Sequence, residues 1–289
     1  MLYYNLMKIS IVTASYNYQD YIKETIQSVL DQTYKDWEFI IVDDCSTDNS
    51  VEVIKSYKDD RIKLFVNEKN LGLKETLKFG IKQASGDWVA ILESDDILKQ
   101  DYLEKKYEVI KRNPNVAVIF NDVELFGDEN RVKNTTPTII ETSNLLQNKI
   151  YPCNIFDDLV DFNRVLTFSA VMLNRQKFLE CNLNTPMDKL FDWWLFLHLA
   201  RKYDFYYIPE KLTKWRLHSG SYISYKERLF DYPVNVAALI DLIKKEKDIR
   251  LFPPLFKASF STAKRFKSKL FRAIKKTLGI PLREEMQKH

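Results

Sequence analysis

The sequence WVAILESDD, residues 88–96, is the most informative segment of this chain. Its first five residues are apolar, and so short an apolar run predicts a buried strand. The strand leads directly into Glu93, Asp95 and Asp96. Carboxylates gathered at the tip of a buried strand repel one another unless a cation lies among them, and their oxygens suit Mg²⁺ or Mn²⁺. Taken alone, such a segment is more often a strand that ends in a solvated acidic turn.

Apolar, β-branched runs alternate with helical patterns through the first part of the chain. Strands are expected over residues 8–14, 37–42, 61–66, 88–92 and 116–120, and helices over 18–31, 51–57, from the 70–72 turn through Ala84, and over 101–112. This alternation predicts an α/β fold, a Rossmann-like and mostly parallel sheet flanked by helices.

Polar clusters fall at the carboxyl ends of three of these strands, where the ligands of such sheets bind. Residues 15–17 (SYN) follow the first strand, Asp43 and Asp44 follow the second, and the acids of residues 93–96 follow the fourth. Three clusters at one edge of a sheet favour a ligand site far more than one cluster does.

The second half of the chain is less regular. Residues 128–149 are polar with few periodic apolar positions, so an irregular loop that faces the substrate is expected there. Strands are expected again over residues 168–173, 205–208 and 211–217, and helices over 175–181 and 191–201, the second of them buried because it is largely apolar.

Charge and cysteine content limit the class of protein. The 44 basic residues nearly balance the 40 acidic ones, so the net charge of +4 is no nucleic-acid signature in itself. The three cysteines are odd in number and far apart, which fits a reducing compartment better than a disulfide framework. With no signal peptide and no run of the roughly 18 apolar residues that a spanning helix needs, a cytoplasmic protein is expected.

The basic residues gather near the C-terminus. Residues 255–278 hold eight lysines and arginines and no acids, and apolar side chains recur there at helical spacing. A basic amphipathic helix predicts contact with a membrane surface, here the inner face of the cell membrane. The alternatives are a helix packed on the rest of the protein and a nucleic-acid-binding helix. We expect membrane contact through residues 254–278 and no nucleic acid.

Several motifs, taken in order, resemble those of one family. They are IVTASYN (11–17), SVLDQTY (28–34), WEFIIVDDCSTD (37–48), NLGL (70–73), ASGDWVAILESDD (84–96) and FDWWL (191–195). Their order and spacing resemble the family 2 glycosyltransferases of bacterial cell-surface polysaccharide synthesis, which have the GT-A fold. The resemblance predicts a GT-A catalytic domain over residues 1–222 and a helical, basic C-terminal extension over 223–289.

The resemblance implies a hexosyltransferase that moves one sugar, with inversion, from a nucleotide diphosphate sugar to an acceptor hydroxyl. It implies a UDP-sugar donor, Mn²⁺ or Mg²⁺, and an acceptor that is a surface polysaccharide or a lipid-linked oligosaccharide. The nucleotide-binding residues would be Ala14, Tyr16, Asp43, Asp44, Lys74 and Asp95. Ala14 and Tyr16 would line the base pocket, and Asp44 would accept a hydrogen bond from uracil.

The resemblance also implies a metal site and a base. Asp95 and Asp96 would hold the metal and the ribose, with Glu93 and His218 as further candidate metal ligands. A divalent metal stabilises the charge that develops on a leaving diphosphate. Asp192 would be the general base, because the acceptor hydroxyl must lose a proton as it attacks. Burial among aromatic neighbours would raise the pKa of Asp192, and the helix N-terminus would lower it.

The sequence departs from the family pattern in three places. Glu93 stands where the family has an aspartate, and its extra methylene puts the ribose or metal contact there in doubt. Leu77 and Lys78 stand where the family often has Ala-Arg-Asn, which leaves these positions without a predicted donor role. The QxxRW motif of processive synthases is absent, so one sugar per encounter is expected.

Three other functions stay open at this point. A nucleotidyltransferase would need a glycine-rich phosphate loop near the N-terminus, and residues 13–18 hold no glycine. A signalling receiver domain would be much shorter and would carry its acid pair after the first strand. A catalytically inactive sugar-nucleotide-binding protein stays open because of Glu93.

Overall fold

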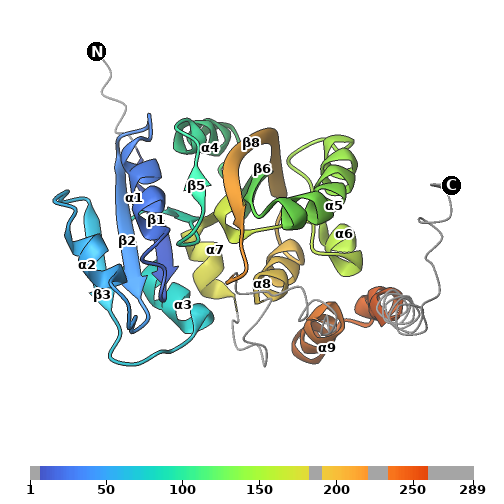
Figure 1. Cartoon of the computed structure of the whole chain (residues 1–289). Helices are drawn as coiled ribbons and strands as arrows, with labels where there is room; N and C mark the ends of the chain where they lie inside the picture. Colours follow the sequence, from blue (N-terminus) through green and yellow to red (C-terminus); the bar gives the residue numbers. More distant parts are fainter. Residues whose placement is uncertain (1–6, 182–190, 221–233, 260–289) are drawn as a thin grey trace, which may run out of the picture.

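Eight strands form one mixed sheet in the computed structural model, which describes residues 7–181, 191–220 and 234–259 (Figure 1). Across the sheet their order is β3-β2-β1-β4-β7-β6-β8-β5. The strands are β1 (Ile9–Ser15), β2 (Trp37–Asp43), β3 (Ile62–Val66), β4 (Trp88–Ile91), β5 (Ile97–Leu98), β6 (Val118–Gly127), β7 (Val171–Asn174) and β8 (Phe205–Leu217). The pairs among β1 to β4 are parallel, as is β6 with β8, whereas β7 is antiparallel to both β4 and β6 and β5 is antiparallel to β8. The α/β prediction is confirmed, with a sheet that is mixed beyond β4.

Helices cover both faces of this sheet. They are α1 (Ile22–Leu30), α2 (Ser50–Lys55), α3 (Leu73–Gln83), α4 (Tyr102–Arg112), α5 (Glu129–Gln147), α6 (Phe156–Asp161), α7 (Arg175–Glu180), α8 (Phe191–Ala200) and α9 (Val234–Glu246). Side chains of β1 alternate between two apolar cores. Val12 belongs to the core shared with α3, α8 and α9, and Ile11 to the core shared with α1 and α4. Because both faces are covered, β1, β2 and β4 are mostly apolar in sequence. The polar Ser10, Thr13 and Glu38 within β1 and β2 are buried as well.

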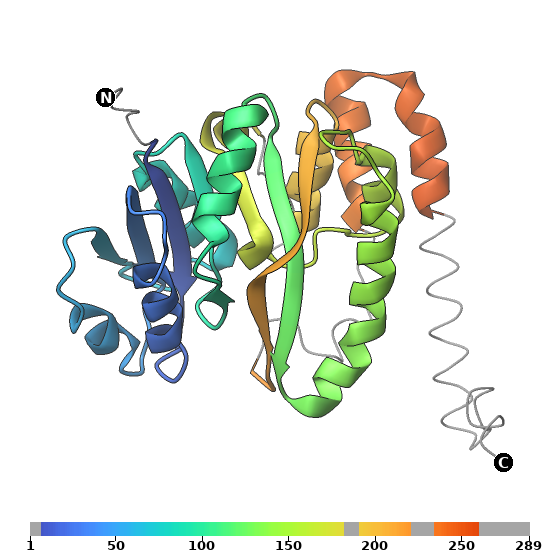
Figure 2. The ribbon, with the colours of Figure 1, turned by 90° about the horizontal axis from the view of Figure 1, so that it is seen from above.

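The segment 128–149, expected to be an irregular loop, is instead mostly the helix α5. Asp128 caps its first turn by accepting a hydrogen bond from the backbone N–H of Arg131 (2.9 Å). The side chains that the helix buries are Ile139, Thr142 and Leu146. These three positions have helical spacing, but Thr142 is polar. The sequence therefore lacks the regular apolar pattern by which a helix is recognised. Figure 2 shows α5 lying alongside β6 and β8.

Smaller differences concern the elements around the later strands. The predicted strand over residues 168–173 begins as a 3-10 turn (Phe168–Ala170) and becomes β7 only at Val171. The two strands expected over 205–208 and 211–217 are the single strand β8, whose register with β6 shifts on both sides of Asp122. β5 and α6 were not predicted, whereas α9 lies within the extension 223–289 that was expected to be helical but was given no helix bounds.

Gly80 packs α3 directly onto β1 and β2. A Cβ atom at this position would lie 2.6 Å from Cγ1 of Val12 and 3.2 Å from Cγ2 of Val42, and both valines are fully buried. Gly80→Ala is therefore expected to destabilise the protein by about 1–3 kcal/mol, because overpacking outweighs the gain of about 1 kcal/mol in helix propensity.

Urea unfolding of Gly80→Ala beside Gln83→Ala, an exposed position of the same helix, measures this effect. The control is expected to stay within about 0.5 kcal/mol of the wild type. A Gly80→Ala protein as stable as its control would contradict the close packing of α3.

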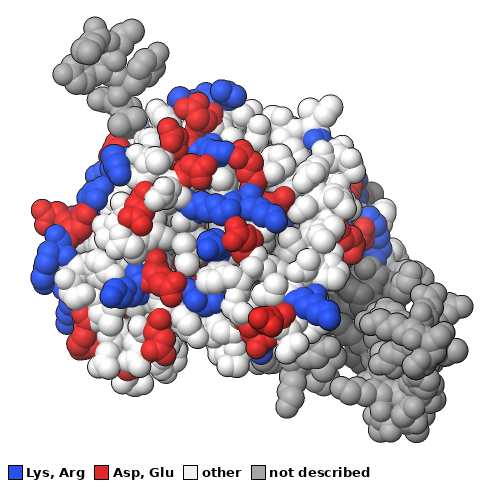
Figure 3. Space-filling model, turned by 45° about the horizontal axis from the view of Figure 1, so that its top comes forward, with Lys and Arg blue, Asp and Glu red and all other residues white. Residues whose placement is uncertain are grey.

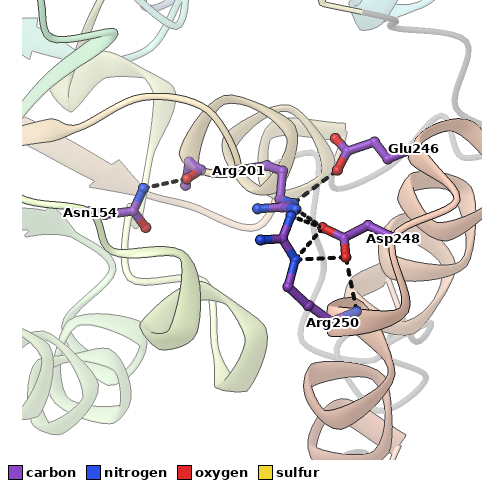
Figure 4. A network of polar contacts seen from close by, with 6 residues as sticks. Asn154, Arg201, Glu246, Asp248 and Arg250 are labelled. Carbon is purple, nitrogen blue, oxygen red and sulfur yellow. Dashed lines mark hydrogen bonds and ion pairs between the residues drawn. The ribbon is translucent and has the colours of Figure 1, made fainter.

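The described part of the C-terminal region packs on α8. Val234, Leu239 and Leu242 of α9 are buried in the same core as α8. Polar contacts add to this junction, as Figure 4 shows: Arg201 donates to Glu246 (3.0 Å) and Asp248 (2.5 Å), and Arg250 also binds Asp248. The predicted boundary between residues 222 and 223 lies within 221–233, outside the described residues, and stays a prediction.

Positive and negative side chains alternate over the face drawn in Figure 3. Among the described residues, Lys99 pairs with Glu124 (2.8 Å) and Lys105 pairs with Glu210. None of the described helices is long and apolar enough to cross a membrane. Most of the predicted membrane-contacting segment, residues 260–278, lies outside the described residues, and within 254–259 Phe256 is 74% exposed.

Candidate active site

Buried threonine hydroxyl groups donate hydrogen bonds to backbone carbonyl oxygens of the acidic turn after β4 and of Leu92, which leads into it. Thr25 of α1 places its Oγ1 3.0 Å from the carbonyl oxygen of Ser94 and 2.9 Å from that of Asp96. Thr13 of β1 donates to the carbonyl oxygen of Leu92 (2.7 Å). These contacts fix the backbone of the turn, so its acids project from a rigid support.

Asp96 is fully buried at the base of the turn. Its Oδ1 accepts a hydrogen bond from the backbone N–H of Arg216 (2.8 Å). Its Oδ2 is buried and, among the described residues, has no donor within hydrogen-bonding geometry. Burial, with the charges of Asp95 and Glu93, raises the pKa of Asp96 well above its usual range. A bound cation would relieve this cost, since positive charge favours ionised carboxylates.

Asp95 meets the end of β8. Its Oδ2 lies 2.9 Å from Nε2 of His218, and its carbonyl oxygen accepts from Nε of Arg216 (2.8 Å). The Arg216 guanidinium lies 4.9 Å from the ring centre of Tyr21 and 4.3 Å from that of Phe126. The carboxyl ends of β4 and β8 therefore form one site, as predicted for Asp95 and His218.

Glu93 faces a different part of the site. Thr167 donates to its Oε2 (2.5 Å), and its backbone N–H donates to Oγ of Ser169 (2.9 Å). Burial, and after it the charge of Asp95, raises the pKa of Glu93 to about 7. The charge of Asp192 raises the pKa of Glu93 further.

Asp192 lies in the first turn of α8. The side-chain amide of Asn163 donates to its Oδ2 (2.9 Å). Burial raises the pKa of Asp192 to about 6, against hydrogen bonds from the Trp193 backbone and from Asn163 that lower it. This carboxyl is ionised at neutral pH and more basic than an ordinary aspartate, as a general base should be.

The predicted nucleotide-binding acids follow β2. Asp44 accepts hydrogen bonds from the Asn67 amide and from the backbone N–H groups of Leu71 and Gly72, all at 2.8 Å. It thereby fixes the turn before α3, where Gly72 has a φ of 82° that favours glycine. Asp43 accepts from the backbone N–H and the hydroxyl of Ser46. Of the roughly four acceptor positions of a carboxylate, the chain itself thus fills three on Asp44 and two on Asp43.

The other predicted nucleotide-binding residues surround this turn. Ala14, the last residue but one of β1, pairs with Val42, and Tyr16, just beyond the strand, is 42% exposed, as a ligand-facing ring would be. Lys74 lies in the first turn of α3 with a side chain only 15% exposed and an ion pair to Glu75 (3.9 Å). The carboxyl ends of β1, β2 and β4 thus share one edge, as the sequence predicted.

Four residues of the site were not predicted. Arg216 lies two residues before His218, within the strand expected over 211–217, but its contacts with the acidic turn depend on the fold. Asn163 and Thr167 lie in a segment without motif or periodicity. Tyr18 lies beside His218, with ring centres 6.0 Å apart. Burial and the charges of Asp95, Glu93 and Asp96 raise the pKa of Tyr18 strongly.

The donor set fits a divalent cation that the substrate helps to bind. Among the described residues no group of three His, Cys, Asp or Glu side chains forms a ready-made metal cage. Oδ2 of Asp95 and Nε2 of His218 nevertheless meet at 2.9 Å, and the adjacent Asp96 offers a further, buried carboxylate. Mg²⁺ commonly takes one or two protein carboxylates and completes its shell with substrate phosphates and water.

Comparison with known proteins identifies the family. Residues 10–172, more than half of the chain, match the model of glycosyl transferase family 2. The chain belongs to this family. It is 33% identical over 226 residues to TuaG of Bacillus subtilis, whose name assigns it to teichuronic acid biosynthesis as a glycosyltransferase; the match covers 75% of this chain and 82% of TuaG. The protein is therefore a glycosyltransferase, and the predicted family is confirmed.

Solved glycosyltransferases share the fold. TarS of S. aureus with UDP-GlcNAc has a TM-score of 0.62 at 17% identity, over 88% of this chain and 73% of TarS. The mannosyltransferase PcManGT of Pyrobaculum calidifontis, solved with GDP-Man and Mn²⁺, has a TM-score of 0.61 at 15% identity, over 92% and 74% of the two chains. At these identities the likeness establishes the GT-A fold alone.

Proposed function

We propose that this glycosyltransferase moves one sugar from a UDP-sugar to an acceptor hydroxyl with inversion at the anomeric carbon. The observation that carries the proposal is the half-buried Asp192, whose pKa is raised to about 6 and whose charge acts on Glu93 of the acidic turn that also holds Asp95 and Asp96. A base on one side and a phosphate-binding turn on the other are what a single displacement needs. The Mn²⁺ and nucleotide sugars bound by fold neighbours support the donor assignment.

The donor would lie along the edge formed by β1, β2 and β4. Ala14, Tyr16 and the turn fixed by Asp44 would hold the nucleoside, with Asp43 supporting the Ser46 turn beside it. Lys74 would approach the diphosphate. Asp95 and Asp96, with His218 and Glu93 as further candidates, would hold Mn²⁺ or Mg²⁺. Such a metal supplies Lewis-acid stabilisation of the leaving diphosphate.

Asp192 would take the proton in the displacement. The acceptor oxygen forms a bond to the anomeric carbon on the face opposite the nucleotide, while its proton passes to the Asp192 carboxylate. The bond from the anomeric carbon to the diphosphate oxygen breaks, and its electron pair leaves with UDP. The configuration at the anomeric carbon is inverted, because attack and departure occur on opposite faces.

Sugar transfer is expected to fall below about pH 6, by tenfold for each further pH unit. The reason is that burial raises the pKa of Asp192 to about 6, and the protonated carboxyl accepts no second proton. Initial rates of UDP release between pH 5 and 8, at saturating donor and metal, measure this acid limb, the part of the pH profile in which the rate falls. A rate that stays constant down to pH 5 would contradict the assignment, and a limb near pH 7 would point to Glu93 instead.

Thermal unfolding with a panel of nucleotide sugars, with and without Mn²⁺, tests the donor class. A ligand that binds only the folded protein stabilises it by about 2.7 kcal/mol at a concentration of 100 Kd. We expect UDP-sugars with Mn²⁺ to raise the melting temperature and to release UDP on incubation. Stabilisation without any UDP release would indicate an inactive sugar-nucleotide-binding protein.

A polysaccharide or lipid-linked acceptor at the inner membrane face accords with the basic segment 254–278. The name of TuaG, which refers to teichuronic acid, supports a polysaccharide product. Exposed Phe256 at the start of the segment supports membrane contact. Co-sedimentation with vesicles is expected to require anionic lipid and to be lost when residues 260–289 are removed. Equal binding to neutral vesicles would contradict this role.

A further inference from the structure

One segment of chain touches both Glu93 and Asp192. It covers residues 163–169, between α6 and β7, and is called the bridging segment here. Its Asn163 donates to Asp192 Oδ2 (2.9 Å), its Thr167 donates to Glu93 Oε2 (2.5 Å), and its Ser169 accepts from the Glu93 backbone (2.9 Å). The segment therefore fixes these two acids relative to each other.

The orientation of the Asn163 amide is set by a second contact. Its Oδ1 accepts a hydrogen bond from the backbone N–H of Val165 (3.2 Å), and Val165 is fully buried. Since a backbone N–H is only a donor, the oxygen of the amide must face Val165. The NH₂ group is then the end that faces Asp192, and it cannot turn away without breaking both contacts.

We propose that Asn163 is a positioning residue for the base, which holds Oδ2 of Asp192 so that Oδ1 receives the proton of the acceptor. This inference rests on the proposed role of Asp192. A neutral donor suits the task, because it stabilises the carboxylate without the charge that would make it a weaker base. Glu93, on the other side, is held away by Thr167.

Two variants of Asn163 separate positioning from support of the backbone. Asn163→Asp keeps the size of the side chain and the oxygen that accepts from Val165, but replaces the donor with a second carboxylate. Two carboxylates at about 3 Å do not both ionise, so a proton would be trapped on the pair. Asn163→Ala removes both contacts and adds no charge.

The assay is UDP release from UDP-GlcNAc, or from whichever UDP-sugar stabilises the protein most, with Mn²⁺ at pH 7. We expect kcat to fall about 10-fold in Asn163→Ala and about 100-fold in Asn163→Asp, in keeping with the strength of hydrogen bonds to charged groups. The Kd for UDP should change less than twofold in both. Asn148→Asp, at an exposed position after α5, is the matched control and should equal the wild type.

The relative activities of the two variants decide whether Asn163 positions the base or only supports the backbone. If Asn163→Asp is as active as the wild type, or more active than Asn163→Ala, Asn163 only supports the bridging segment and the inference is overturned. Should Asn163→Ala fail to fold, Asn163→Asp with wild-type UDP affinity and a lost kcat still supports positioning. Asp192→Asn in the same assay distinguishes failure of this inference from failure of the proposed function. If Asp192→Asn keeps the wild-type kcat, the proposed function itself fails.

Discussion

Asp192→Asn is expected to lower the rate of sugar transfer by a factor of about 10²–10⁴ while the protein still binds UDP. The amide has the shape of the carboxyl and can still sit at the start of α8 among its buried aromatic neighbours. It cannot accept the proton of the acceptor hydroxyl, so only the chemical step is impaired. Stability should change little, because burial disfavours the charge that the substitution removes.

The measurement is UDP release at saturating donor, beside the Kd for UDP from a binding titration. Asp157→Asn is the matched control, since Asp157 also lies in the first turn of a helix, α6, but is exposed. The control should keep the wild-type rate. Wild-type transfer by Asp192→Asn would remove Asp192 as the base, whereas lost transfer together with lost UDP binding would indicate a role in the donor site.

Asp96→Asn is expected to abolish the effect of Mn²⁺ on UDP binding and to lower transfer at least 100-fold. The neutral amide is a poor ligand for a hard cation, and one of only a few protein ligands is lost. The amide oxygen can still accept from the backbone N–H of Arg216. Without metal the variant should melt no lower than the wild type, because the buried Asp96 carboxylate is disfavoured by its surroundings.

Binding of UDP with EDTA and with Mn²⁺ tests this expectation, and the melting temperature with EDTA serves as the control for folding. In the wild type Mn²⁺ should tighten UDP binding, and in Asp96→Asn it should have no effect. If Mn²⁺ tightens UDP binding equally in both proteins, Asp96 is not a metal ligand. A sharp drop in melting temperature would contradict the expectation that the buried Asp96 carboxylate is disfavoured by its surroundings.

The sequence was informative where local pattern and burial agree. Strands β1, β2 and β4 are covered on both faces, so each is mostly apolar and is followed by polar residues. Parallel pairing then brings these polar ends to one edge, as predicted for Asp43, Asp44 and the acids after β4. The apolar helix α8 was found for the same reason, and Asp192 with it.

Elements whose stability comes from distant contacts were missed. α5 buries a stripe that includes Thr142, so its sequence looks polar. Asn163 and Thr167 meet their acids across 29 and 74 residues, and Arg216 meets Asp96 across 120. No local period marks such contacts, because they depend on how β4, β7 and β8 are ordered in the sheet.

The configuration of the first-formed product tests the proposed displacement most directly. With a UDP-sugar whose anomeric carbon is α-linked, proton NMR of the reaction in its first minutes reports the anomer before mutarotation, even when water is the acceptor. Attack assisted by Asp192 on the face opposite the diphosphate predicts the β anomer. An α product would contradict a single displacement with Asp192 as the base.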